Sequence, residues 1–352
     1  MAARTARTVG EAGLIRLIAR WLSVQKRDNR LVKGIGDDCA TVRIRGRQLL
    51  TADSFVEKVH FRREWTSARG RRSGRDAGLA GARDAGWKAL AANISDIAAA
   101  GGIPVAALVS LELPPETKVA WLKGFYSGLL SCARRYGLSV AGGNITRGPH
   151  LAAHITLVGE APRRLVGRAG ARPGDIVAVT GQLGGAVAGL LLLARGIRKG
   201  PAVRRHLHPE PSVRAGQVLA RYASAMADIS DGLARDAGHI AEESGVKVVI
   251  VPGAVPIHPA VKELSYEKPK NRGEDMLPGQ WLDMLARHIA LGSGEEYELV
   301  TTVPRRRFGA AVRALLKIGI TLTAVGEVRR GRGVLLPGHP GPLPGFDHFQ
   351  ER

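Results

Sequence analysis

Acidic and amide side chains recur in short polar motifs of this sequence. Two aspartates stand side by side in GIGDDCA at 34–40, further acids lie in LLTADSFV, NISD and DISDG, and an asparagine lies in AGGNITRG. Mg²⁺ prefers oxygen ligands, with one or two carboxylates per ion and with water and substrate phosphates completing the shell. Carboxylates from several separate segments therefore indicate several magnesium ions that bridge a polyphosphate.

Each of these motifs adjoins the end of an expected strand or the start of an expected helix, where α/β proteins collect ligand groups. The tetrapeptides 93–96 and 228–231 are nearly the same and each is followed by a helical pattern. Helix capping is therefore the competing interpretation for either one alone. The SDG sequence at 230–232 would also offer backbone amides and a positive helix dipole to an anion.

Other phosphate-binding and hydrolytic motifs are missing from the sequence. It contains no Gly-Lys dipeptide and hence no Walker loop, no G-x-G-x-x-G, no H-E-x-x-H and no G-x-S-x-G. The acidic motifs are therefore the main candidates for chemistry.

The formal net charge is +21, and six arginines against one acid fall within 62–75. Clustered arginine is compatible with a nucleic-acid partner. However, an aromatic content of 5% provides few stacking residues for single strands. We favour a solvated basic surface that also attracts anionic substrates, and we do not expect a nucleic-acid partner.

Two isolated cysteines and the lack of an apolar run long enough to cross a bilayer predict a protein of the reducing cytoplasm without a membrane span. Apolar residues at helical spacing near the N-terminus predict an amphipathic helix there.

The elements that must position the acids form two α/β domains, 1–160 and 161–352. Strands are expected at 48–56, 105–113, 150–160 and 175–180, and helices at 87–102, 117–137 and 181–196. A second helix and strand follow within 227–251, and strands at 297–304 and 321–328 complete the chain. The segment 62–83 is treated as a variable loop, and 266–280 has the composition of a surface loop.

In chain order, the motifs GIGDDCA, TADSFVEKVHF, WKALAANISDIAAAGG, AGGNITRG, DISDGLARDAGHIAEESG, GSGEEYELV and GFDHF resemble those of thiamine-monophosphate kinases. The resemblance runs from about Gly10 to Phe349. It implies two α/β domains with mixed sheets flanked by helices, and N-terminal sheets that pair in a homodimer to form a shared barrel. The implied reaction uses ATP to convert thiamine monophosphate to thiamine diphosphate.

The same resemblance implies roles for individual residues. The implied magnesium ligands are Asp37, Thr51, Asp53, Asp96, Asn144, Asp228 and Asp231. The implied ATP contacts are Gly143, Asn144, Arg168, Ser230 and Tyr126. The implied contacts to thiamine monophosphate are His60, Glu295 and Phe346. Asp96 and Asp231 are predicted to be the catalytic aspartates.

Two points at these motifs stay open. Asn144 stands where many relatives have Asp, so one negative charge is lost and the number of magnesium ions is undetermined. Asp37 is the predicted ligand of the first motif, whereas Asp38 is as well explained by a hydrogen bond within the turn.

The acceptor in the implied reaction is a phosphate monoester whose second pKa is about 6, so it is already a dianionic nucleophile at neutral pH. No general base is needed, and the requirement is to hold two anions together in line. Two other functions remain as alternatives. One is a different ATP-using enzyme of the aminoimidazole-ribonucleotide-synthetase-like superfamily, and the other is a basic nucleic-acid-binding protein with a vestigial site.

Overall fold

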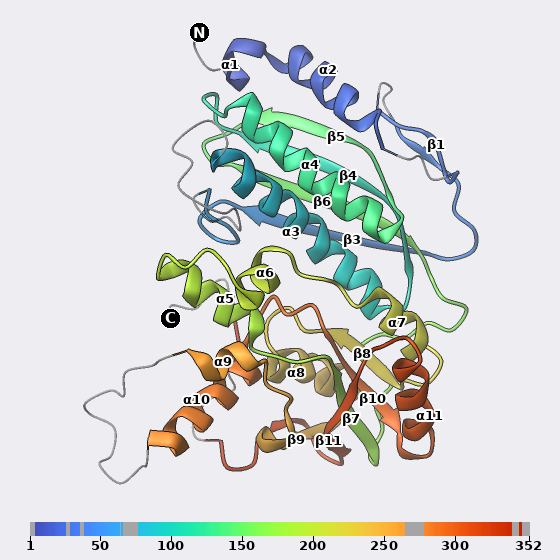
Figure 1. Ribbon diagram of the computed structural model, residues 1–352. Helices are drawn as coiled ribbons and strands as arrows, with labels where there is room; N and C mark the ends of the chain where they lie inside the picture. Colours follow the sequence, from blue (N-terminus) through green and yellow to red (C-terminus); the bar gives the residue numbers. More distant parts are fainter. Residues whose placement is uncertain are drawn as a thin grey trace. The chain divides into compact units, whose positions relative to one another are not determined.

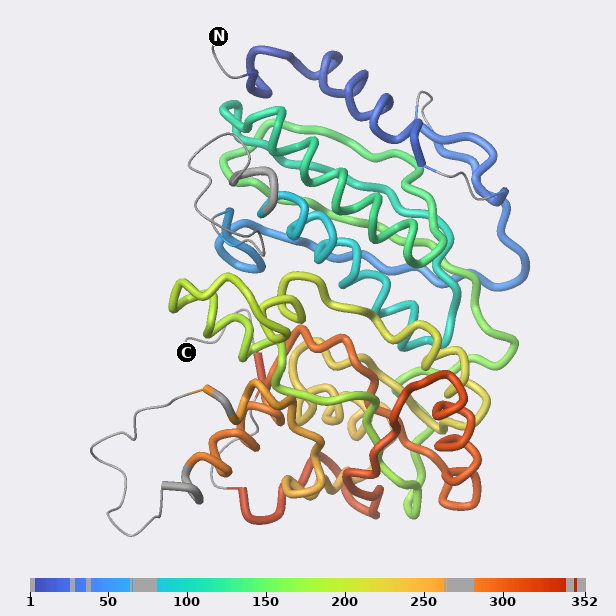
Figure 2. The backbone as a smooth tube through the Cα atoms, viewed as in Figure 1, coloured from blue at the N-terminus to red at the C-terminus, as the bar shows by residue number. Residues whose placement is uncertain are grey.

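A computed structural model describes residues 4–25, 29–35, 39–63, 65, 77–264, 278–339 and 345–346 of the 352-residue chain (Figures 1 and 2). The chain divides into two compact units. Unit 1 comprises Met1–Ile97 and Gly102–Ala161, and unit 2 comprises Ala98–Gly101 and Pro162–Arg352.

Unit 1 is built on a four-stranded sheet of order β3-β6-β4-β5, in which β4 and β5 are parallel and the other pairs antiparallel. Helices α3 and α4 lie on one face of this sheet, and α2 lies beside α4 and β5 (Figure 1). Its elements are α1 (Ala6–Val9), α2 (Glu11–Leu22), β1 (Leu31–Lys33), β2 (Thr41–Val42), β3 (Gln48–Val56), α3 (Ala77–Ala99), β4 (Ile103–Leu113), α4 (Val119–Tyr136), β5 (Ser139–Arg147) and β6 (Ala152–Glu160).

Helices α3 and α4 cross at two glycines. A Cβ added at Gly86 would lie 1.9 Å from the carbonyl oxygen of Phe125, and one at Gly128 would lie 1.9 Å from that of Arg83. The two backbones therefore pack with no side chain between them. Helix α3 begins at Ala77, so the expectation of a loop through residue 83 was wrong for 77–83. At Gly86, this tertiary packing outweighs the low helix propensity of glycine.

Unit 2 contains a six-stranded mixed sheet of order β12-β9-β11-β7-β10-β8. One face of this sheet packs on α8 and α10, and the opposite face packs on α7 and α11. Along β7, Val177 and Val179 lie on the first face and Ala178 lies on the second. Its elements are β7 (Asp175–Thr180), α5 (Gly185–Ala194), α6 (Pro201–Leu207), α7 (Val213–Leu219), β8 (Ala225–Asp228), α8 (Leu233–Ser244), β9 (Lys247–Ile250), the 3₁₀ turn η1 (Pro252–Ala254), α9 (Pro259–Glu263), α10 (Pro278–Gly292), β10 (Leu299–Pro304), α11 (Arg305–Leu316), β11 (Leu322–Arg329) and β12 (Gly333–Leu335).

The expected fold class is confirmed, because both units combine mixed sheets with flanking helices. The expected strands at 48–56 and 175–180 match β3 and β7 residue for residue. Helix α4 ends, as expected, at Gly137 in the left-handed conformation. The loop expected at 266–280 lies outside the described residues up to 277, and α10 begins at Pro278.

The N-terminal amphipathic helix is α2, which buries Leu14, Ile18 and Leu22 along one face. In the described part of the chain, no helix combines the length and the apolar character needed to cross a bilayer.

Candidate active site

The acids of unit 1 lie where β3 faces α3. Thr51 and Asp53 are two residues apart on β3 and so point to the same face of the sheet. Asp96 projects from α3 toward this face, and the Thr51 hydroxyl donates a hydrogen bond to its Oδ2. The structure thus brings Thr51 and Asp96 together and places Asp53 on the same side of the sheet.

Asn144 lies at the other edge and on the other face of this sheet. Asp53 is in register with Ile155, Val109 and Gly143, whereas Asn144 is in register with the next row, formed by Ser54, His154 and Ser110. The hydrogen bond between Ser54 Oγ and His154 Nδ1, at 2.9 Å, runs along that second row on the face opposite α3. Three strand spacings of about 4.8 Å separate β3 from β5. Within one chain the structure does not bring Asn144 to Asp53.

The expectation that every acidic motif adjoins a strand end or a helix start was therefore only partly right. Asp53 and Asn144 lie inside their strands, and Asp96 lies near the end of α3 rather than at the start of a helix. Asp228 ends β8 and Asp231 precedes α8, as expected. Asp37 and its neighbour Asp38 lie outside the described residues.

His60 is held in a turn directly after β3. Its Nδ1 accepts a hydrogen bond from the Val56 amide at 3.1 Å, and its ring stacks on Phe55 with 5.8 Å between centroids. The buried Lys88 of α3 donates to the His60 carbonyl oxygen at 3.3 Å. The position of this turn is therefore coupled to α3, the helix that carries Asp96.

Tyr126, by contrast, lies in the interior of unit 1. Its ring packs 5.9 Å from that of Trp21 and 6.0 Å from that of Phe125, and burial raises the pKa of its phenol above the usual value. This arrangement accounts for Tyr126 as a core residue and offers no support for its predicted contact with ATP.

In unit 2, Asp236 organises the Ser230–Gly232 turn. Its Oδ2 accepts hydrogen bonds from the backbone amides of Ser230, Asp231 and Gly232 at 3.0, 3.1 and 3.0 Å. These amides were expected to receive a ligand anion, but they are already paired with this carboxylate. Asp236 is not among the residues predicted from the motifs, although an acid in the first turn of a helix is a recognisable sign of such a role.

Three carboxylates gather around this turn. Burial, followed by the charges of Asp228 and Asp231, raises the pKa of Asp236 well above its usual range. Ligand atoms of Asp231, Asp236 and His239 all lie within 4.8 Å of one another. Burial, with the nearby charges of Arg168 and Arg235, lowers the pKa of His239 and favours its neutral form. Crowded carboxylates beside a neutral imidazole fit a divalent cation, which would relieve their mutual repulsion.

Arg168 belongs to the same region, since its charge acts on His239. The Ser244 hydroxyl donates to the Arg168 carbonyl oxygen at 3.1 Å and accepts hydrogen bonds from the amides of Gly170 and Ala171, each at 3.1 Å. The segment that carries the guanidinium is thereby fixed to the end of α8.

Both predicted substrate residues of unit 2 are bonded to this turn. The Glu295 amide donates to the Ser230 carbonyl oxygen at 2.7 Å, and the Phe346 amide donates to that of Asp231 at 2.9 Å. Arg235 also donates to the Phe346 carbonyl oxygen. Glu295 has a φ of 58°, and its carboxylate lies 3.5 Å from Nδ1 of the buried His206. The structure thus brings Ser230, Asp231, Glu295 and Phe346 together.

A buried network of ion pairs fixes the segment that follows Glu295 in the chain. Arg205 Nε donates to Glu296 Oε2 at 3.0 Å and Nη2 donates to Glu298 Oε1 at 2.8 Å. This network could not be predicted from the sequence, because Arg205 lies on α6, its partners lie just before β10, and no local pattern links them.

Comparison with known proteins identifies the class to which this architecture belongs. The N-terminal domain model of AIR synthase related proteins matches residues 36–161, and the C-terminal domain model of the same proteins matches 172–336. The chain is therefore an AIR synthase related protein. At 21% identity and a TM-score of 0.67, a hydrogenase maturation protein of Escherichia coli shares this fold.

Closer relatives narrow the assignment. The thiamine-monophosphate kinase of Aquifex aeolicus is 35% identical over 347 residues, covering 97% of this chain and 98% of the relative. That of Escherichia coli K12 is 33% identical over 363 residues, covering 96% and 98%. Among solved structures, the Stenotrophomonas maltophilia enzyme gives a TM-score of 0.74 at 32% identity, covering 93% and 96%. AaThiL complexed with AMPPCP and TMP gives 0.72 at 34% identity, covering 97% of each chain. The chain belongs to the thiamine-monophosphate kinase family.

Proposed function

We propose that this protein transfers the γ-phosphoryl group of ATP to the phosphate of thiamine monophosphate, giving thiamine diphosphate and ADP. The observation that carries the proposal is the Ser230–Asp231 turn, to which Glu295 and Phe346 are hydrogen-bonded. Residues assigned to the metal and ATP and residues assigned to thiamine monophosphate thus meet in one place. The AaThiL complex with an ATP analogue supports ATP as the phosphoryl donor.

Magnesium is assigned to the acidic groups described above. In unit 2, Asp228 and Asp231 would hold it, with Asp236 fixing the turn between them. In unit 1, Thr51, Asp53 and Asp96 would do so. Bound Mg²⁺ would neutralise phosphate oxygens of both substrates. Asp37 and Asn144 complete the proposed ligand set, and Asp96 and Asp231 are its catalytic members.

The other residues bind and orient the two substrates. Arg168 presents a planar pair of donors suited to a phosphate. Gly143, Asn144 and Ser230 are assigned to ATP, and the assignment of Tyr126 to ATP rests on the resemblance alone. His60 is assigned to thiamine monophosphate. Glu295 offers a carboxylate and Phe346 an aromatic face to the cationic thiazolium ring. The transfer is in line and needs no base from the protein, because the acceptor phosphate is already a dianion.

A homodimer that pairs two N-terminal sheets into a barrel is part of the proposal. The sheet face opposite α3 carries Leu50 and Leu108, which are 71% and 40% exposed, together with Asn144. Apolar side chains on an uncovered sheet face favour burial against a second copy. Asn144 would then point into the dimer rather than toward Asp53 of its own chain.

Residues 1–160 are accordingly assigned to ATP and metal binding and to dimerisation, and 161–352 to completing the active site. We assign the enzyme to the cytoplasm, where its two substrates would be found.

The test is a panel of phosphate acceptors assayed for ADP release with ATP and Mg²⁺. Thiamine monophosphate is expected to support turnover, with thiamine diphosphate as the product. Asp96→Asn removes one charge at constant shape and is expected to abolish most of this turnover without loss of fold by circular dichroism. Glu243→Gln, on the exposed side of α8, is the matched control and should stay fully active.

The outcomes separate the alternatives. ADP release with a different acceptor and none with thiamine monophosphate would indicate another ATP-using enzyme of the superfamily. Salt-sensitive binding of DNA or RNA without turnover of ATP would indicate the nucleic-acid-binding alternative. Full activity of Asp96→Asn would contradict the metal assignment in unit 1.

A further inference from the structure

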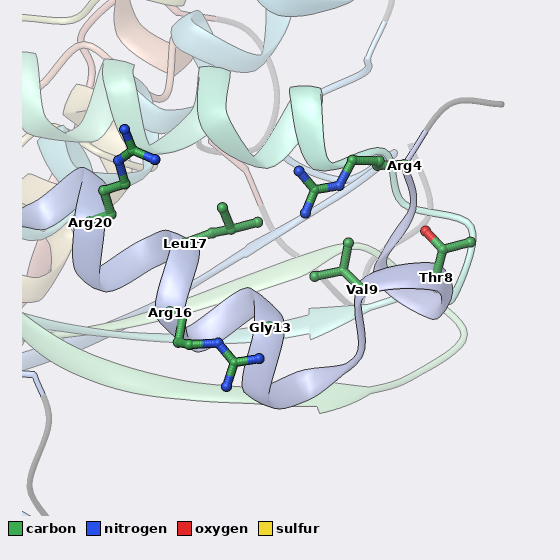
Figure 3. Close-up of a pocket in the computed structure, with 7 residues that line it drawn as sticks. All are labelled: Arg4, Thr8, Val9, Gly13, Arg16, Leu17 and Arg20. Atoms are coloured by element: carbon green, nitrogen blue, oxygen red, sulfur yellow. The ribbon is translucent and has the colours of Figure 1, made fainter. Parts of the chain in front are cut away.

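A pocket lined by arginines lies between the first two helices of unit 1. It has a volume of about 560 Å³, and its lining includes Arg4, Arg16 and Arg20 with the apolar Val9 and Leu17. Figure 3 shows the Arg4 and Arg20 side chains on one side of α2, with Leu17 between them and Val9 below Arg4. None of these residues is assigned to the proposed active site.

The pocket is shaped before any ligand arrives. The backbone of the first segment is fixed to the start of α4, because the Val119 amide donates to the Arg4 carbonyl oxygen at 3.0 Å and the Ala6 amide donates to that of Thr117 at 2.8 Å. The floor is close-packed, since a Cβ added at Gly13 would lie 2.6 Å from Val9 Cγ1. Binding here would therefore cost little ordering of the backbone.

Among the residues that the structure describes, no acid pairs with the positive charges of this pocket. Within the described ranges, none of the three guanidinium groups forms an ion pair, whereas the neighbouring Arg7 pairs with Glu116 at 2.8 Å. Arg16 and Arg20 are four residues apart on α2, a spacing at which like charges repel each other. A bound anion would remove this repulsion.

We propose that this pocket binds a small phosphate-bearing anion. Guanidinium groups bind phosphate through paired N–H donors, and Val9 and Leu17 add an apolar surface for the organic part of such a molecule. The hollow is open to solvent, and its volume of about 560 Å³ admits a small phosphate-bearing anion. The site does not depend on the proposed kinase activity.

The experiment is isothermal titration of the full-length protein with inorganic pyrophosphate at low ionic strength and with EDTA, so that magnesium does not recruit the anion elsewhere. We expect saturable binding of one pyrophosphate per chain. Arg16→Gln with Arg20→Gln should weaken it at least roughly tenfold. The matched control removes the same charge from α11 by Arg306→Gln with Arg307→Gln and should change the affinity less than about twofold. Arg4→Gln is an independent second variant.

Competition by ADP and by thiamine diphosphate distinguishes a nucleotide from another organic diphosphate as the occupant. The double substitution on α2, Arg16→Gln with Arg20→Gln, is called the α2 variant. Its turnover at saturating substrates should equal that of the unchanged protein. The proposal is overturned if pyrophosphate does not saturate, if the control variant loses affinity equally, or if the α2 variant loses binding of a single-stranded oligonucleotide while it keeps that of pyrophosphate.

Discussion

Replacing Arg205 by methionine tests how the ion network beneath the Glu295 segment contributes to stability. Methionine keeps much of the volume of the side chain and removes its charge. The change removes the hydrogen bonds to Glu296 and Glu298 at 3.0 and 2.8 Å and one to the Gln182 carbonyl oxygen at 3.2 Å. Two carboxylates then lose their shared cation.

The size of the expected loss of stability depends on the hydrogen bonds that the two carboxylates keep. Glu296 keeps the Ser293 hydroxyl at 2.6 Å and the Ala186 amide at 2.9 Å. Glu298 keeps the Thr180 hydroxyl at 2.6 Å and the Ser212 hydroxyl at 3.0 Å. Removing one partner of a buried ion pair costs about 3–5 kcal/mol of stability. Because both carboxylates keep other hydrogen-bond donors, we expect a cost at the lower end, about 3 kcal/mol. For a unit of this size, Tm should fall by roughly 6–12 °C.

The loss should depend on pH in a defined direction. Burial raises the pKa of Glu296, and Arg205 offsets part of that rise. Without Arg205 the folded-state pKa rises further above the unfolded value of about 4.3. A carboxyl with a raised pKa destabilises the fold only when ionised. The cost is therefore absent below the unfolded pKa and grows as pH rises toward the folded pKa.

The assay is thermal and urea unfolding followed by circular dichroism near pH 5 and pH 7.5, with the larger loss expected at the higher pH. Arg204→Met is the matched control: Arg204 is 76% exposed, lies 3.9 Å from Glu210, and should change stability by less than about 0.5 kcal/mol. Adding Glu296→Gln to Arg205→Met should restore at least about 1 kcal/mol. A loss of stability below about 1 kcal/mol, or an equal loss at both pH values, would show that Arg205 does not stabilise the ionised glutamates.

Three further outcomes are expected. Gly86→Ala should destabilise unit 1 by about 2–3 kcal/mol in urea unfolding, because its Cβ would meet the backbone of α4, whereas Gly309→Ala on the exposed side of α11 should be neutral or stabilising. Lys88→Met should raise KM for thiamine monophosphate roughly tenfold with little change in kcat, because Lys88 is 2% exposed and donates a hydrogen bond to the His60 turn. Lys123→Met on α4 is the control. An unchanged KM in Lys88→Met would contradict the coupling between α3 and the His60 turn. EDTA should abolish turnover until Mg²⁺ is restored, and undiminished turnover in EDTA would exclude a metal-dependent transfer.

Local patterns predicted much of the fold. Alternation of apolar residues gave β3 and β7 their bounds, and the glycine after Tyr136 marked the end of α4, because each of these features depends on neighbours in the chain. The start of α3 could not be predicted in this way. Glycine lowers helix propensity, and the contact that favours Gly86 comes from α4, which is distant in sequence.

In the candidate site, too, local features could be predicted and features that depend on distant residues could not. The motifs located Asp228, Asp231 and Glu295 in sequence, but the face on which Asn144 lies depends on strand register across three neighbours, which one strand does not encode. Likewise, the amides of the SDG turn looked available for an anion until Asp236, in the following helix, was seen to accept all three.

The link between the Ser230–Asp231 turn and Phe346 constrains the order of events during protein synthesis. Arg235 and its acceptor on Phe346 are 111 residues apart in the chain. A ribosome must therefore translate the chain through Phe346 before this hydrogen bond can form. The strands of unit 1 end at Glu160, so its sheet can form far earlier during translation. A nascent chain arrested before Phe346 could contain the folded sheet of unit 1, whereas its Ser230–Asp231 turn would lack the hydrogen bonds to Phe346.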